Sequence, residues 1–172
     1  MLIKNRYRKG WINMAKEVKT NAMRILDKKK IAYKVNQYEC EEFIDGIHIA
    51  DQLGQSYEQS FKTLVAIGKS KEHYVFVLPV DKEIDFKKAA RLVGEKSIEL
   101  VHVKEIQALT GYIRGGCTAI GMKKQFKTYI DSSAEAQKEI IVSGGKIGVQ
   151  LLLSPEDLKR VVNGQYADFI SE

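Results

Sequence analysis

The chain has 172 residues, of which 44% are hydrophobic and 29% charged, the composition of an ordinary globular domain. No run approaches the roughly 20 apolar residues that a membrane-spanning helix needs, and no apolar stretch follows the basic start, so we expect no membrane span and no signal peptide. The two cysteines, Cys40 and Cys117, lack metal-ligand spacing and indicate free thiols in a reducing compartment, which favours a cytoplasmic protein.

The net charge of +6 is concentrated at one end. Residues 1–13 carry four positive charges, and the rest of the chain is close to balance, with 24 basic and 22 acidic side chains. We therefore expect residues 1–13 to be a flexible basic extension and residues 14–172 to form one domain.

Apolar periodicity predicts the elements in chain order. Val18, Ala22, Ile25 and Leu26 recur at helical spacing, and the lysines at 28–30 end this first helix, because cations favour the C-terminal end of a helix dipole. The elements predicted after it are a strand over 31–38, a short helix over 46–54, a hairpin of buried strands over 61–68 and 73–80, a helix over 86–93, a strand over 98–103, a short helix over 104–110, strands near 126–131, 138–143 and 146–153, and a helix that starts at Pro155.

Cap residues support two of these helices. Asp85 and Gly94 flank the helix over 86–93, and Ser154 precedes the last helix, which Gly164 follows. Strands outnumber helices and do not alternate with them regularly. The pattern therefore predicts a single α+β domain with a mixed sheet and helices packed around it.

The segment "GYIRGGCTAIGMKK", residues 111–124, has three possible interpretations: a phosphate-binding loop, a loop that presents a nucleophilic cysteine, or a backbone wall close to a ligand. The phosphate loop fails, because Met122 and Lys123 stand where a P-loop needs lysine and then serine or threonine.

A catalytic Cys117 would need a nearby cation or histidine to lower its pKa. The histidines, His48, His73 and His102, are distant in sequence, and His102 falls inside the strand predicted over 98–103. None has metal-ligand spacing, so we expect no metal and no cofactor.

The wall interpretation gains support from a second glycine cluster, "SGGKIG" at residues 143–148. Two glycine pairs that adjoin strands allow backbone to approach a ligand closely, although ordinary hairpin turns give the same pattern. Lys62 shares strand parity with Leu64 and Ala66 and so starts on an apolar face. A lysine there either extends to solvent or serves an anionic ligand.

The motifs "FKTLV", "GYIRGG" followed by "GMKK", and "VSGGKIGVQL" occur in an order and spacing that resemble the YbaK/EbsC-type aminoacyl-tRNA deacylases, relatives of the editing domain in bacterial prolyl-tRNA synthetases. The resemblance covers roughly residue 15 to the end. It implies a mixed, strongly curved sheet surrounded by helices. It also implies trans-editing, the hydrolysis of the ester that joins a wrong amino acid, typically cysteine, to the tRNA for proline.

The resemblance also implies roles for individual residues. It places the essential lysine at Lys62. The chain departs from the family pattern at Ala119, where proline is usual, and at Ile147, where arginine is common. The substrate-binding positions that the resemblance implies are Tyr38, Gly115, Gly116, Thr118, Gly144 and Gly145.

In the route that the family resemblance implies for a cysteinyl substrate, the substrate's own thiol attacks its carbonyl, so the enzyme supplies no nucleophile and Cys117 has no catalytic part. The implied partners are the mischarged tRNA for proline and prolyl-tRNA synthetase, with lysines at 28–30 and 123–127 as candidate phosphate contacts. Two alternatives stay open: an editor of another pair, such as alanine on this tRNA, and a non-catalytic module that binds a tRNA end or a small ligand.

Overall fold

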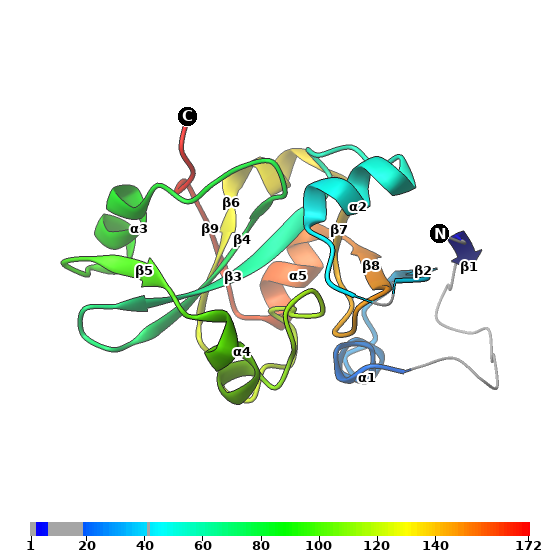
Figure 1. Ribbon diagram of the computed structural model, residues 1–172, viewed down its shortest axis with the longest axis horizontal. Helices are drawn as coiled ribbons and strands as arrows, with labels where there is room; N and C mark the ends of the chain where they lie inside the picture. The colour runs from blue at the N-terminus through cyan, green and yellow to red at the C-terminus, as the bar shows by residue number, and fades with distance from the viewer. Residues whose placement is uncertain (1–2, 7–18, 41) are drawn as a thin grey trace.

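The computed structural model describes residues 3–6, 19–40 and 42–172 (Figure 1). The helices in this part of the chain are α1 (Asn21–Lys28), α2 (Gly46–Leu53), α3 (Phe86–Val93), α4 (Val103–Thr110), the 3-10 helix η1 (Ser132–Ala136) and α5 (Pro155–Val161). The strands are β1 (Ile3–Arg6), β2 (Lys34–Tyr38), β3 (Phe61–Gly68), β4 (His73–Pro79), β5 (Ile98–Leu100), β6 (Lys127–Asp131), β7 (Ile140–Ser143), β8 (Val149–Leu153) and β9 (Gln165–Ala167).

Most of the extension expected at residues 1–13 lies outside the described residues. Its described part, β1, pairs antiparallel with β2. None of the helices in the described ranges is long and apolar enough to cross a membrane.

The α+β character is confirmed, but the strands form two sheets where one was expected. The first, with the order β1-β2-β8-β7, is antiparallel throughout, and the second, β5-β3-β4-β6-β9, is mixed. The sheets meet at the start of β3, where Ser60 forms an isolated bridge to Ile141 and the Ile141 N–H donates to the Gln59 carbonyl at 2.9 Å. This junction positions the site.

The predicted β3–β4 hairpin is confirmed, with Phe61 paired to Pro79 and Ile67 to His73. β4 is buried on both faces, as its unbroken apolar sequence indicates. Its valines, Val75 and Val77, pack into the core that the two sheets share, and its alternate residues pack toward α3.

The helix caps agree with the sequence. Asp85 accepts the N–H groups of Lys87 and Lys88, each at 3.0 Å, and Gly94 ends α3 in the left-handed conformation. Ser154 accepts the Asp157 N–H at 3.3 Å at the start of α5.

The strand predicted over 98–103 is too long, and the place given to His102 was wrong. β5 ends at Leu100, and His102 is the exposed N-cap of α4. Its backbone N–H donates to Glu105 Oε2 at 3.2 Å, so a helix start outweighs the local strand pattern. The short elements η1 and β9 were not predicted.

Candidate functional site

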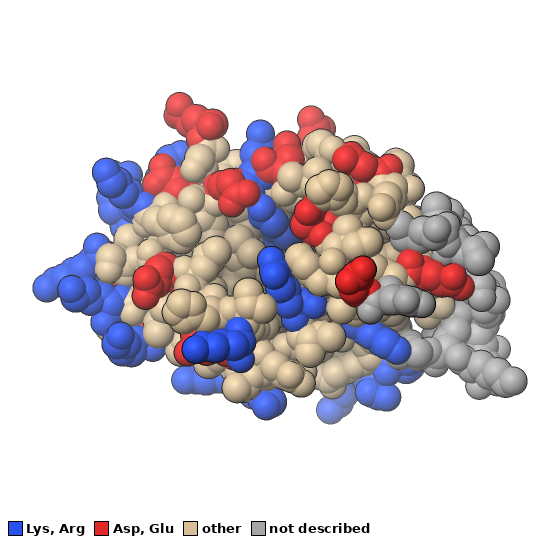
Figure 2. All heavy atoms as spheres, in the orientation of Figure 1, with Lys and Arg blue, Asp and Glu red and all other residues tan. Residues whose placement is uncertain are grey.

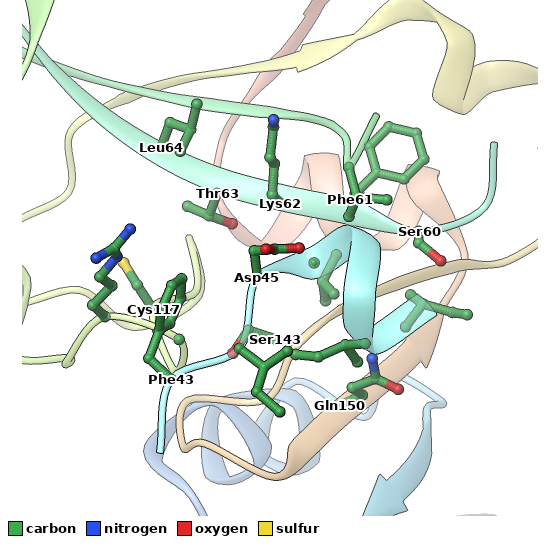
Figure 3. A pocket seen from close by; sticks show the side chains of 18 of the residues that line it. Phe43, Asp45, Ser60, Phe61, Lys62, Thr63, Leu64, Cys117, Ser143 and Gln150 are labelled. Carbon is green, nitrogen blue, oxygen red and sulfur yellow. The ribbon is translucent and has the colours of Figure 1, made fainter. Parts of the chain in front are cut away.

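A cavity of about 320 Å³ opens where the two sheets meet, beside β3 and the first turn of α2 (Figure 3). Its walls come from the end of β2, the start of β3, the loop after α4 and the strands β7 and β8. This volume lies at the small end of ligand pockets, about 300–1,000 Å³, and suits one small group. The apolar lining includes Phe61, Val65, Val101, Ile106, Ile141 and Val149.

The edge of β3 that faces the cavity is uncovered between the Ser60–Ile141 bridge and the residues that pair with β5. β5 pairs only with residues 66–68 of β3, and on that side the Val101 N–H donates to the Val65 carbonyl at 3.0 Å. Alternate residues of an antiparallel strand direct their N–H and C=O toward the same side. Thr63 lies two positions before Val65 and lines the cavity, so its peptide N–H and C=O face this space.

Two glycine loops pack together behind the cavity. A Cβ at Gly116 would lie 2.9 Å from the Cα of Lys146, closer than a real side chain comes, so glycine is required for this contact. In the second loop the Gly144 N–H donates to the Val149 carbonyl at 2.8 Å. Gly115 lines the cavity, whereas Gly116, Gly144 and Gly145 do not.

Lys62 lies at the rim of the cavity. Its ammonium lies 3.3 Å from Glu83 Oε1, and the two side chains are 23% and 77% exposed. Figure 3 shows Lys62 and Leu64 on the side of β3 opposite Thr63. The ammonium is thus partly buried and paired, and a substrate anion would compete with Glu83 for it.

Tyr38 ends β2 and lines the cavity with a buried ring. Its backbone N–H donates to the Gly148 carbonyl at 2.9 Å, which joins β2 to the second glycine loop. Burial raises the pKa of its phenol, with a smaller contribution from Cys40, so the hydroxyl is a neutral donor at physiological pH.

Cys117 lines the cavity, but Thr118 does not. Burial raises the pKa of the Cys117 thiol to about 11, which keeps it protonated and unreactive. Thr118 is 1% exposed, and its hydroxyl accepts the Ile120 N–H at 3.3 Å. The hydroxyl therefore stabilises the loop behind the wall.

Sequence reasoning missed several lining residues. The Ser143 hydroxyl oxygen is buried and has no hydrogen-bond partner among the described residues, and Ser143 lines the cavity. Asp45 caps α2 by accepting the His48 N–H at 3.0 Å, and this hydrogen bond is the main cause of its lowered pKa. Ser143 falls within the motif "VSGGKIGVQL", so this motif could have identified it as a site residue.

An amide pair closes the cavity between the end of α2 and β8. Gln55 Nε2 donates to Gln150 Oε1 at 2.8 Å, and Gln150 Nε2 donates back to Gln55 Oε1 at 3.2 Å. Both residues line the cavity. They lie 95 positions apart, so no local pattern indicates the contact.

No cluster of three or more His, Cys, Asp or Glu side chains in the described part of the chain could hold a metal ion. His48, His73 and His102 do not line the cavity.

Residues 47–161, which include most of this cavity, match the family model described as the aminoacyl-tRNA editing domain. The chain belongs to the aminoacyl-tRNA editing domain family. A relative from Enterococcus faecalis (strain ATCC 700802 / V583), EbsC, is named as a candidate Cys-tRNA(Pro)/Cys-tRNA(Cys) deacylase. It is 43% identical over 155 residues, which are 90% of this chain and 94% of the relative.

Solved structures share the fold of this editing domain. A crystal structure described as a candidate trans-editing enzyme for prolyl tRNA synthetase superimposes with a TM-score of 0.76 at 23% identity, covering 90% of this chain and 100% of the other. A structure from the computational grafting of linear epitopes onto scaffold proteins has a TM-score of 0.78 at 24% identity, covering 90% and 99%.

The two departures from the family pattern, Ala119 and Ile147, lie in or beside the glycine loops. Ala119 is buried, and Ile147 is half-buried with its side chain beside Gly115. Ile147 therefore supports the glycine loop.

The lysines named in the sequence analysis are exposed, at the end of α1, between the first glycine loop and β6, and at the first position of β6. Figure 2 shows basic side chains at the left end of the molecule and along its lower edge, with acidic ones mainly above. The candidate phosphate contacts are Lys28, Lys29, Lys30, Lys123, Lys124 and Lys127.

Proposed function

We propose that this editing domain deacylates mischarged tRNA, with cysteinyl-tRNA for proline as its substrate. The 43% identity to EbsC over 94% of that relative supports the substrate class. The size of the cavity supports it too, because about 320 Å³ suits one aminoacyl group and leaves the nucleic acid outside.

The observation that carries the mechanism is the state of Cys117. The thiol in the cavity wall has a pKa raised to about 11, and no histidine lines the cavity, so the lining offers no activated side-chain nucleophile. The substrate thiol, with an ordinary pKa of about 8.5, is the better nucleophile. Its sulfur bonds to the carbonyl carbon and the ester C–O bond breaks. The thiol proton passes to the departing 3′ oxygen of the tRNA, and the amino acid leaves as a thiolactone.

The residues of the wall then have distinct roles. Lys62 stabilises the negative charge that develops on the carbonyl oxygen or the thiolate, after leaving Glu83. The peptide N–H of Thr63 and the free Ser143 hydroxyl are further donors for the same oxygen. Tyr38 and Gly115 bound the aminoacyl group, while Gly116, Thr118, Gly144 and Gly145 hold the wall in position.

The tRNA and a synthetase are the proposed partners. The exposed lysines at 28–30 and 123–127 contact tRNA phosphates, and docking on prolyl-tRNA synthetase in the cytoplasm supplies selection for the tRNA. Replacing the lysines at 123–127 should weaken tRNA binding and reduce its salt dependence.

The test measures amino-acid release from cysteinyl-, seryl- and alanyl-tRNA for proline. We expect rapid release of cysteine alone, because serine lacks the thiol and alanine has no nucleophile. Lys62→Ala should abolish release and Cys117→Ala should retain it. Lys88→Ala is a matched control, because Lys88 also forms an ion pair, to Asp168 at 3.5 Å, but does not line the cavity.

Each alternative has its own outcome. Rapid release of alanine would contradict the thiol route and favour an editor of another pair. Binding of aminoacyl-tRNA without release of the amino acid would favour a non-catalytic module. An inactive Cys117→Ala variant would indicate that Cys117 is the nucleophile.

A further inference from the structure

Phe43 and Arg114 form a stacked pair at the mouth of the cavity. The guanidinium carbon of Arg114 lies 4.0 Å from the centre of the Phe43 ring. The ring belongs to the segment before α2 and the guanidinium to the first glycine loop, and both residues line the cavity. Phe43 is 41% exposed, and Arg114 is also exposed. A planar cation and an aromatic ring thus lie at the point where a ligand bound in the cavity would extend out of it.

The local backbone fixes this arrangement. Gly115 has a φ of +87°, and a Cβ there would lie 3.0 Å from Phe43 Cδ2, so glycine both makes the turn and leaves room for the ring. The Gly116 N–H donates to the Ile113 carbonyl at 3.0 Å, which tightens the same turn.

The charge of Arg114 is not neutralised locally, since it forms no ion pair within the described ranges. The guanidinium lies over the ring, and both side chains are exposed, so a planar ligand can reach the pair. Exposed apolar side chains, Leu100 and Val103, line the same mouth. Flat, apolar and cationic surroundings of this kind bind nucleobases by stacking.

We propose that the Arg114–Phe43 pair is the platform on which the terminal adenine of the tRNA acceptor end stacks. This inference rests on the proposed function, in which the aminoacyl group fills the cavity and the terminal nucleoside stays at its mouth. Arg114 provides the plane, and Phe43 holds that plane in position. Base stacking on one such platform changes affinity by roughly tenfold.

The probe is adenosine that carries cysteine through a 3′-amide, which is not hydrolysed, compared with cysteinamide, which has no nucleoside. Calorimetry measures both affinities. We expect Arg114→Ala to weaken binding of the adenosine probe about tenfold and to leave cysteinamide unchanged. Arg114→Lys, which keeps the charge without the plane, should lose most of the same affinity. Arg91→Ala is the matched control, because Arg91 is an exposed arginine that does not line the cavity.

The outcomes decide the inference separately from the function. Equal weakening of both probes by Arg114→Ala would mean that Arg114 shapes the cavity, and full affinity in Arg114→Lys would mean that a positive charge suffices without the guanidinium plane; either result overturns the platform. A wild type that binds the adenosine probe no better than cysteinamide also overturns it. If the wild type releases no amino acid from tRNA but binds the adenosine probe in an Arg114-dependent way, the platform stands and the deacylase activity fails.

Discussion

Replacing Gly116 by alanine tests whether the two glycine loops must touch. The added Cβ would meet the Cα of Lys146 at 2.9 Å and the Ile147 nitrogen at 3.1 Å, and both are backbone atoms that no side-chain rotation can move away. Overpacking of this kind costs about 1–3 kcal/mol. The φ of Gly116 is not in the left-handed region, so without a clash alanine would stabilise the protein by about 0.4–1 kcal/mol through the unfolded state.

The net expectation for Gly116→Ala is a loss of about 1–2 kcal/mol, which lowers Tm by roughly 2–8 °C in a chain of this size. Urea and thermal unfolding measure it, and affinity for the non-hydrolysed cysteinyl-adenosine probe should fall as the wall shifts. Gly94→Ala is the control, because Gly94 has a φ of +77° and no atom within 4 Å of a Cβ, and it lies at the end of α3 away from the cavity, so it costs backbone strain without moving the cavity. A Gly116→Ala protein as stable as the wild type, or more stable, would refute the steric argument.

Three further predictions concern charged and titrating groups. Glu83→Gln should raise kcat/KM by no more than about fivefold at low salt, because an ion pair to Lys62 in which Glu83 is largely exposed contributes under about 1 kcal/mol; a larger change would mean a different role for Glu83. Cys117, buried and with a pKa of about 11, should resist iodoacetamide at pH 8 while the less buried Cys40 reacts, which intact mass measures; rapid double alkylation would contradict this. Asp45→Ala should cost about 1 kcal/mol of stability at pH 7. The pKa of Asp45 is lowered below 3.8 in the folded protein, so the difference in unfolding free energy between the wild type and Asp45→Ala should vanish as the pH falls through the folded-state pKa. Urea titrations at several pH values measure this difference, and one that persists at low pH would be a packing effect.

Local signals account for the elements that were predicted correctly. The hairpin of β3 and β4 follows from two apolar runs around the polar turn "KSKE", and α3 follows from its cap residues Asp85 and Gly94. The division into two sheets could not be predicted, because it depends on the pairing of β2 with β8, more than 100 positions apart. β9 has three residues, too few for a periodic pattern.

The sequence likewise predicted only part of the candidate site. Strand parity placed Lys62 on the same side of β3 as Leu64, as Figure 3 shows. The glycine pairs were expected to bring backbone close to a ligand, but Gly116 packs against the second glycine loop, and of the four paired glycines Gly115 alone lines the cavity. The partner of Lys62, Glu83, lies 21 positions away, and Arg114 meets Phe43 across 71 positions. These contacts depend on the fold, so short sequence motifs could not predict them.

The amide pair between Gln55 and Gln150 makes the closure of the cavity independent of acid and salt. Neither side chain titrates, so no proton can open the contact, and ionic screening does not weaken it. If both amides rotate by half a turn, each donor becomes the acceptor and the same two hydrogen bonds form again. The contact thus has two equivalent forms, and this side of the cavity keeps its shape in either one.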